Sequence, residues 1–385
     1  MNIKELDKEY VLGTYSRLDL AIVSGKGSYL YSDDGKKYLD FGSGIAVNTF
    51  GASDKIFCRA IKSQLSKIQH TSNYYYTAPS ALLAKEMCER TGMKKVFFCN
   101  SGAEANECAI KAARKYGTSK DPEKNIIITL KNSFHGRTVT TLSATGQDVF
   151  HKDFTPFTEG FVYCEANNSE ELLSLMNDKI CAVMVEIVQG EGGVNTLSEE
   201  FLKTVSEVSE KYDTLIIVDE VQTGNGRTGT LYAYEQFSLS PHIVSTAKGL
   251  GGGLPIGAIM FSEKLKDILP SGSHGSTFGG NPVCAAGALS VLKRLDESFL
   301  KNVSEKGEFL KEELLKIKGV KSVSGLGLMI GIETEKSAKE ILLKCMDRGL
   351  LVLTAKDKVR LLPPLNIKMK ELKKGLEILK GVIEE

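Results

Sequence analysis

The sequence predicts an α/β protein, with a large domain built on a mostly parallel seven-stranded sheet and a smaller α+β domain. Through the middle of the chain, short apolar runs bounded by turn residues alternate with longer stretches of helical periodicity, which is typical of parallel strands joined by helices. After residue 280 the pattern changes to long helical stretches around a few short strands. These changes predict an N-terminal segment at 1–50, a large domain at 51–280 and a small domain at 281–385.

The N-terminal segment contains a predicted β-hairpin. Its sequence is GSYLYSDDGKKYLDF, and Asp34-Gly35 supplies the residue pair that tight hairpin turns favour. We expect this segment to pack with the smaller domain or against a partner subunit.

The large domain is predicted to hold seven strands and the helices that cover them. The apolar runs do not alternate with polar residues, which indicates strands covered by helices on both faces. The strands are predicted at 94–100, 125–132, 160–165, 181–188, 214–221, 242–248 and 256–262, and the helices at 81–91, 103–117, 169–177 and 199–212.

The smaller domain is predicted to consist of long helices around short strands. The helical patterns fall at 282–317, 335–348 and 368–383, and the short strands near 319–333, 350–354 and 358–362.

Composition excludes several classes of function. A chain of 385 residues is too long for a lone binding module. Its 49 Lys and Arg against 48 Asp and Glu leave a formal charge of +1, so no basic stripe for nucleic acid is expected. No apolar run approaches the ~20 residues of a membrane-spanning helix. The N-terminus lacks the features of a secretory signal, and a cytoplasmic location is predicted.

Two further patterns are weak signals. The eight cysteines include no C-x-x-C pair, so we expect no metal site and no disulfide framework. Residues 224–229 match G-x-G-x-x-G after a predicted strand, but a dinucleotide site needs an acid ~20 residues further on. The chain has Ala247, Lys248 and Gly249 there, so a nicotinamide cofactor is not expected, and no P-loop pattern is present.

A carboxylate and a lysine follow two of the predicted buried strands. Asp219 ends the strand in TLIIVDEVQTG, and Lys248 ends the next one in HIVSTAKGLGGG. Ligands of open α/β sheets bind at the carboxyl ends of strands, so both side chains are expected at one crevice. A lysine there can act as a nucleophilic amine, and a carboxylate can keep a pyridine nitrogen protonated, as pyridoxal phosphate chemistry requires. Taken alone, the pair is also compatible with surface charges or an ion pair.

The motif NSGAEANE adds an anion site to this pair. Ser101, Gly102 and Ala103 open a helix directly after a strand, where free N–H groups and the helix dipole favour a phosphate. Taken alone, the same residues are compatible with an ordinary N-cap followed by Glu104.

The motifs, taken in order, resemble those of the class III, or ω-amino acid, pyridoxal-phosphate aminotransferases of fold type I. The resemblance covers nearly the whole chain. One departure is GASDKIFCRAI at 51–61, where relatives typically have His-x-His-Pro after the glycine, so the helix entry there is not predicted. The motifs are TYSRLDLAIVSGKGSYLYSDDGKKYLDFGSGIAVN, NSGAEANE, NSFHGRT, EIVQGEGG, VDEVQTGNGRTG, AKGLGGGLPIGA, HGSTFGGNP and RLLPPL.

The resemblance implies an aminotransferase with pyridoxal 5'-phosphate held in the large domain and no metal. Lys248 is expected to bond to the cofactor and to carry the proton, and Asp219 to pair with the ring nitrogen. His135 is expected to support the residues that contact the cofactor rather than to take part in catalysis. The other implied cofactor contacts are Phe134 on the ring, Gln222 at the phenolic oxygen, Ser101, Gly102 and Ala103 at the phosphate, and Thr277 at the phosphate of the partner subunit, which implies a homodimer.

Substrate residues are implied in the same way. Arg360 in KVRLLPPL is expected to bind the α-carboxylate of glutamate or 2-oxoglutarate, and Arg137 in FHGRT the distal carboxylate, because a planar guanidinium binds a carboxylate in bidentate fashion. Glu191 in EIVQGEGG is expected to pair with Arg360 when the amine donor is bound. Ile45 favours a donor without a free α-ammonium, since ornithine-specific relatives tend to place a tyrosine there; an ordinary core isoleucine is the alternative.

The implied reaction is transfer of the δ-amino group of N-acetylornithine to 2-oxoglutarate, as arginine biosynthesis requires. Relatives with the same core residues act on succinylornithine, ornithine, 4-aminobutyrate, lysine-type intermediates or succinyl-diaminopimelate, and these donors remain open. An aminomutase or racemase shares Lys248 and Asp219, but Arg137 and Arg360 together with Glu191 favour a two-substrate aminotransferase. A scaffold that had lost its cofactor would be expected to lack Lys248.

Overall fold

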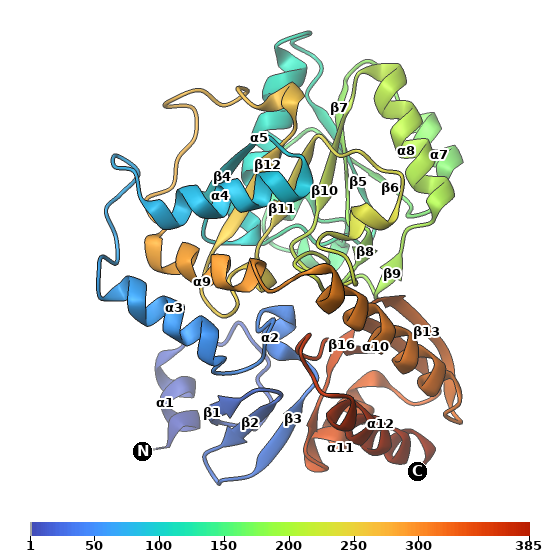
Figure 1. The fold of residues 1–385 in the computed structure, drawn as a ribbon. Helices are drawn as coiled ribbons and strands as arrows, with labels where there is room; N and C mark the ends of the chain where they lie inside the picture. The colour runs from blue at the N-terminus through green and yellow to red at the C-terminus, as the bar shows by residue number, and fades with distance from the viewer. Residues whose placement is uncertain (1) are drawn as a thin grey trace.

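A seven-stranded sheet forms the centre of the large domain in the computed structural model, which describes residues 2–385 (Figure 1). Its strand order is β4-β12-β11-β10-β7-β5-β6, and every pairing is parallel except the two that β12 makes. All seven predicted strands are present, and the mostly parallel sheet is confirmed. They are β4 (Lys95–Cys99), β5 (Ile126–Leu130), β6 (Phe161–Cys164), β7 (Ile180–Val185), β10 (Leu215–Asp219), β11 (Ile243–Thr246) and β12 (Gly257–Phe261).

Helices cover both faces of this sheet, as the apolar strands predicted. Ile217 of β10 packs in one core cluster with Ala109 of α5, whereas the next residue, Val218, packs in another with Phe201 of α8. Since alternate residues of a strand point to opposite faces, α5 and α8 lie on opposite sides of the sheet. The four predicted helices are α4 (Ala78–Thr91), α5 (Gly102–Thr118), α7 (Ser169–Leu175) and α8 (Glu199–Tyr212).

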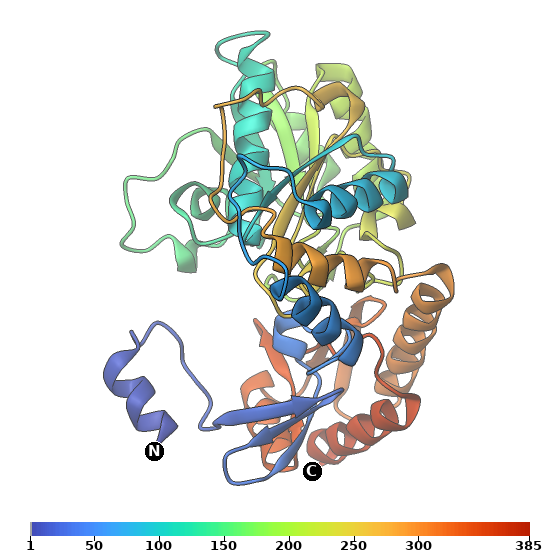
Figure 2. The same ribbon diagram turned by 60° about the vertical axis from the view of Figure 1, so that its left-hand side comes forward.

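The predicted N-terminal hairpin is present and lies beside the C-terminal elements. Gly35 has φ 82° at the turn, a left-handed conformation that glycine adopts without steric cost. The last strand of the hairpin pairs in parallel with β15 (Leu350–Leu351), so the two ends of the chain share one sheet. Figure 2 shows α1 (Ile3–Tyr10) standing away from the rest of the chain. The strands here are β1 (Ile22–Lys26), β2 (Tyr29–Ser32) and β3 (Lys37–Asp40).

The C-terminal part combines a second four-stranded sheet with helices. Its order is β13-β14-β17-β16, and each pairing is antiparallel. Figure 1 shows this second sheet below the large sheet, beside the N-terminal segment. The elements are β13 (Val320–Leu326), β14 (Met329–Thr334), β16 (Leu353–Ala355), β17 (Lys358–Leu361), α9 (Pro282–Leu292), α10 (Glu297–Leu315), α11 (Ala338–Asp347) and α12 (Met369–Glu384).

Three predicted elements are each divided in the structure. The helix expected at 282–317 is α9 followed by α10, because Asp296 accepts the N–H of Phe299 at 2.8 Å and begins a new helix. The strand expected near 319–333 is the hairpin of β13 and β14, which turns at Gly327 with φ 53°. The predicted run at 181–188 likewise ends as β7, and the chain continues into the short pair β8 (Val188–Gln189) and β9 (Asn195–Thr196).

Several short helices were not predicted. Among them is α3 (Lys55–Leu65), which lies in the departure GASDKIFCRAI. Asp54 caps this helix by accepting the N–H of Phe57 at 2.9 Å, and it also pairs with Arg294 at 2.9 Å. The helix entry is therefore an ordinary N-cap. The others are α1, α2 (Ser43–Ala46) and α6 (Val139–Ala144). Among residues 2–385, no helix has both the length and the apolar character needed to cross a membrane.

Candidate active site

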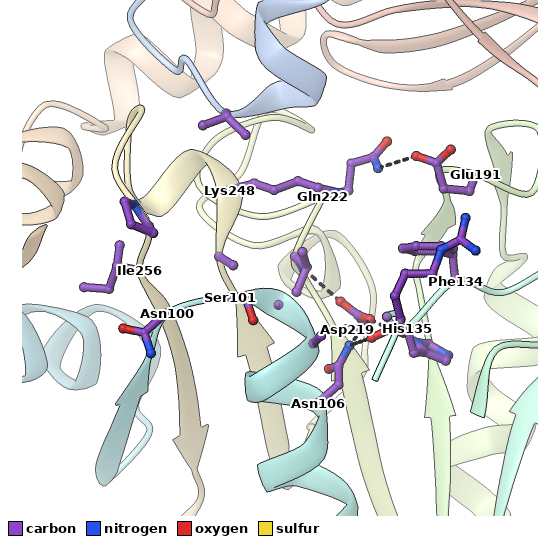
Figure 3. Close-up of a pocket in the computed structure, with 18 of the residues that line it drawn as sticks. Asn100, Ser101, Asn106, Phe134, His135, Glu191, Asp219, Gln222, Lys248 and Ile256 are labelled. Carbon is purple, nitrogen blue, oxygen red and sulfur yellow. Dashed lines mark hydrogen bonds and ion pairs between the residues drawn. The ribbon is translucent and has the colours of Figure 1, made fainter. Parts of the chain in front are cut away.

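A cavity of about 520 Å³ opens at the carboxyl ends of β4, β5, β7, β10 and β11 (Figure 3). This is the edge at which open α/β sheets bind ligands. Most of the predicted site residues come together here. Those that line the cavity are Ser101, Gly102, Ala103, Phe134, His135, Arg137, Glu191, Asp219, Gln222 and Lys248.

Asp219 is buried at the end of β10 and is held by three donors. One oxygen, Oδ2, accepts from Asn106 Nδ2 at 2.7 Å and lies 2.8 Å from His135 Nδ1, and Oδ1 accepts the N–H of Val221 at 3.0 Å. Burial alone would lower the pKa of His135, but the hydrogen bond and charge of Asp219 raise it above its ordinary value. These three donors fix the orientation of the Asp219 carboxyl group at the cavity.

The start of α5 supplies an anion site on the other side. Ser101 caps the helix by accepting the N–H of Glu104 at 3.2 Å, and the Glu104 carboxylate accepts the N–H of Asn100 at 2.8 Å. The ordinary N-cap, which is the alternative interpretation of this motif, is therefore present. The N–H groups of Gly102 and Ala103 have no acceptor within the helix and remain for a ligand. A Cβ on Gly102 would lie 2.7 Å from Val221, so glycine allows this close packing.

Phe134 is fixed from two directions. Its N–H donates to Glu186 at 2.9 Å, and its ring meets Phe150 edge to face with the centroids 5.8 Å apart. Arg137 is exposed, and its guanidinium lies 3.9 Å from the ring centroid of Phe150 and 5.5 Å from that of Phe134. The cavity thus has an aromatic wall with a cation at its rim.

Lys248 follows β11 and extends into the cavity (Figure 3). Its φ is 42°, a left-handed conformation that costs energy for a residue with a side chain. The Thr49 hydroxyl donates to the carbonyl of Gly249 at 2.8 Å and anchors this turn. Burial lowers the pKa of Lys248 below its ordinary value. A larger share of the amine is therefore neutral, which is the nucleophilic form.

Arg360 and Glu191 form an ion pair beside Lys248. Arg360 lies on β17 and is 3% exposed, and its two terminal nitrogens contact the two oxygens of Glu191 at 2.6 and 3.3 Å. Burial alone would raise the pKa of Glu191, but the Arg360 guanidinium lowers it, so Glu191 is ionised. Gln222 accepts from Arg360 at 3.1 Å. A Cβ on Gly190 would lie 2.4 Å from the Gln222 amide oxygen, so a side chain there would displace this amide from Arg360.

Three predicted residues do not line the cavity. Arg360 lies behind Glu191, which does line it. Ile45 is 43% exposed and has φ 60°, so it is not an ordinary core isoleucine. Thr277 is exposed on the loop before α9, next to Ser276, whose hydroxyl accepts from Asn100 at 3.1 Å. Its predicted contact with the cofactor of a partner subunit stays a prediction.

The buried polar residues Asn106 and Glu186 line the cavity but were not predicted from the sequence. Asn106 is buried on α5, where it donates to Asp219 and to the carbonyl of His135 at 2.8 Å. Glu186 directly follows β7, and burial raises its pKa above the ordinary value. Both carried a detectable signal, because each is a polar side chain within an otherwise apolar or small-residue stretch.

Comparison with known proteins supplies independent findings. The family described as aminotransferase class III matches residues 13–383. A relative named acetylornithine aminotransferase, from Haemophilus ducreyi, is 50% identical over 100% of this chain and 98% of its own length.

Solved structures that are similar to this chain are also aminotransferases. N-acetylornithine aminotransferase from Stenotrophomonas maltophilia has a TM-score of 0.85 at 35% identity, covering 98% of each chain. Ornithine aminotransferase from Toxoplasma gondii has a TM-score of 0.93 at 30% identity, covering 99% of this chain and 93% of that one. The latter structure has partial occupancy of pyridoxal phosphate at its active site.

The residues of the cavity fit that cofactor. Its phosphate requires free donors, which the N–H groups of Gly102 and Ala103 offer. Its pyridine nitrogen, when protonated, requires a buried hydrogen-bond acceptor, which the carboxyl group of Asp219 offers. Its aldehyde requires an amine, and Lys248 lines the same cavity.

Proposed function

We propose, because this chain belongs to the class III aminotransferases, that it transfers the δ-amino group of N-acetylornithine to 2-oxoglutarate. The products are N-acetylglutamate 5-semialdehyde and glutamate, and the reaction serves arginine biosynthesis. The enzyme is an aminotransferase with pyridoxal phosphate as its cofactor. The observation that carries the proposal is the buried Arg360 covered by Glu191 beside Lys248, an arrangement that can serve two substrates of different charge.

The roles of the chain's own residues follow from their positions. Pyridoxal phosphate, when bound, supplies an electron-poor ring that can accept the electron pair left by a departing proton. Asp219 holds the proton at the ring nitrogen, and the partly neutral Lys248 takes and returns the substrate proton. Phe134 fixes the plane of the ring, and the start of α5 holds the phosphate.

The two substrates are distinguished by their charge. Glutamate and 2-oxoglutarate bring an α-carboxylate, which Arg360 can bind in bidentate fashion once Glu191 has moved aside. The reacting carbon of N-acetylornithine is a methylene that bears the amine but no carboxylate, so Glu191 stays on Arg360 and no buried cation is left unpaired. Arg137 at the rim would bind the distal carboxylate of glutamate or 2-oxoglutarate. Ile45, which belongs to the N-terminal segment, would contact the amine donor.

A homodimer in the cytoplasm completes the proposal. Three consecutive tyrosines are largely exposed, with exposed fractions of 93% for Tyr74, 72% for Tyr75 and 107% for Tyr76. A cluster of exposed aromatic side chains is typical of a surface that a protein partner covers. The Asn73 side chain bonds the carbonyls of Ser276 and Gly279, so these tyrosines lie beside the loop that carries Thr277. If a second copy of the chain covered this surface, Thr277 of each subunit would lie at the cavity of the other subunit. Sedimentation of the purified protein tests this, because a monomer would contradict it.

The substrate is tested by comparing donors. The purified enzyme is assayed with 2-oxoglutarate and equal concentrations of N-acetylornithine, succinylornithine, ornithine, 4-aminobutyrate or succinyl-diaminopimelate, and kcat/KM is compared. We expect the highest value with N-acetylornithine. A higher value with another donor would assign that donor instead, and product formed without 2-oxoglutarate would indicate an aminomutase.

Glu191→Gln is expected to change the two half-reactions in opposite directions. The half-reaction with glutamate should become several-fold faster, because no resident carboxylate competes for Arg360, and that with N-acetylornithine several-fold slower, because a buried charge then loses its partner. Stopped-flow measurement of each half-reaction separates them. Glu165→Gln, an exposed glutamate that pairs with Lys131, is the matched control. Equal losses on both sides would refute this role of Glu191.

A further inference from the structure

The loop at 224–229, whose glycine pattern resembles a nucleotide-binding motif, is buried between the large sheet and the C-terminal sheet. Arg227 within it is 2% exposed. Its Nη1 donates to two backbone carbonyls, that of Leu328 at 3.0 Å and that of Pro363 at 2.6 Å, and its own carbonyl accepts the N–H of Leu328 at 2.9 Å. Burial lowers the pKa of Arg227, and the nearby carboxylate of Asp40, which acts through its charge, offsets part of that effect. A buried cation whose hydrogen bonds go only to backbone carbonyls is costly to keep out of water.

The glycines of this loop permit its close approach to the C-terminal elements. A Cβ on Gly229 would lie 2.0 Å from the Ser304 hydroxyl of α10, and a Cβ on Gly327 would lie 2.5 Å from the backbone of Thr228. Neither neighbour leaves room for a side chain. The spacing that resembles a dinucleotide fingerprint is therefore explained by packing between two parts of the chain.

Arg227 connects two groups of active-site residues. It lies on the loop that begins with Asp219 and carries Gln222. One of its acceptors, Pro363, follows closely after Arg360 at the end of β17. The same C-terminal segment bonds the N-terminal segment, because the N–H of Leu365 donates to the carbonyl of Thr49 at 2.9 Å.

This connection fixes the two partners of one contact. Gln222 and Arg360 meet at 3.1 Å, and each belongs to a segment that Arg227 holds. Loss of the Arg227 bonds would free the segment after β17 and displace the Arg360 guanidinium from its place beside Gln222 and Glu191. A substrate that uses Arg360 would be affected, whereas one that leaves it paired with Glu191 would not.

We propose that Arg227 is a positioning residue that sets Arg360 for the α-carboxylate of glutamate and 2-oxoglutarate. The inference rests on the proposed function, in which only one of the two substrates uses Arg360. It extends that function by assigning a specificity role to a residue that does not line the cavity.

The test compares Arg227→Met, which keeps an unbranched stem but removes the donors, with Arg227→Lys, which keeps a charge but not the planar fork. In Arg227→Met, kcat/KM for the glutamate half-reaction should fall at least ~10-fold and that for N-acetylornithine less than ~3-fold. In Arg227→Lys, kcat/KM for the glutamate half-reaction should also fall more than that for N-acetylornithine, but by a smaller factor. Calorimetric titration of the holoenzyme with glutarate, a dicarboxylate that cannot react, should show a weaker Kd in parallel.

The matched control is Arg114→Met, since Arg114 is also partly buried and donates to a backbone carbonyl, that of Glu159, but at the amino end of β6, on the opposite edge of the large sheet from the cavity. It should lower the Tm without any split. Equal losses in both half-reactions, or an unchanged Kd for glutarate, in whichever Arg227 variant folds would overturn the proposal. Failure of the proposed function is separately visible, because the wild-type enzyme would then not react with N-acetylornithine.

Discussion

Lys248→Ala is expected to retain pyridoxal phosphate and to lose turnover, with a fall of at least roughly 10²–10⁴-fold in kcat. The start of α5, Asp219 and Phe134 remain to hold the cofactor. What is removed is the only amine that lines the described cavity, and with it the group that bonds the cofactor and carries the substrate proton. The measurement is kcat with saturating N-acetylornithine and 2-oxoglutarate, together with the cofactor content of the purified variant.

The control for this variant is Lys203→Ala, because the Lys203 side chain is 78% exposed on α8. It should leave kcat unchanged. Near-normal turnover of Lys248→Ala would show that the amine is not part of the reaction and would remove the basis of the site assignment.

Asp219→Asn is expected to lower kcat ~10²-fold or more, which corresponds to several kcal/mol in the barrier. Asparagine keeps the shape of the side chain but not the charge that holds a proton on the ring nitrogen. Its NH₂ group would also face the donors of Asn106 or His135, which now lie 2.7 and 2.8 Å from Asp219 Oδ2. The loss of the carboxylate also removes the influence that raises the pKa of His135.

Steady-state kinetics of Asp219→Asn beside Asp213→Asn measures this effect. Asp213 is a partly exposed residue at the end of α8, just before the same strand begins, where it pairs with Lys120 and Lys264, so its replacement should change stability and not kcat. A kcat of Asp219→Asn within about twofold of the wild type would mean that this carboxylate has a structural role only.

The sheet and most of the cavity could be predicted because both depend on local patterns. A continuous apolar run is visible in the sequence, and the residues that follow buried parallel strands meet at one edge. That rule brought Asp219 and Lys248 together correctly, and the resemblance added Gln222 and Phe134.

The features that were not predicted depend mostly on contacts between residues that are far apart in the sequence. The bond between Asn106 and Asp219 spans 113 positions, and that between Arg227 and Pro363 spans 136. No periodicity indicates such partners. The break between α9 and α10 was missed for a different reason, since both stretches have helical periodicity, no glycine or proline lies between them, and the cap at Asp296 is the signal that divides them.

The absorbance spectrum of the holoenzyme tests the central claim most directly. Addition of N-acetylornithine alone should shift the absorbance band of the lysine-bound cofactor to shorter wavelength, and subsequent 2-oxoglutarate should restore it, because each substrate completes one half of the transfer at the same site. A spectrum that N-acetylornithine leaves unchanged, while glutamate shifts it, would contradict the proposed donor, and a spectrum that no amine changes would contradict the aminotransferase site itself.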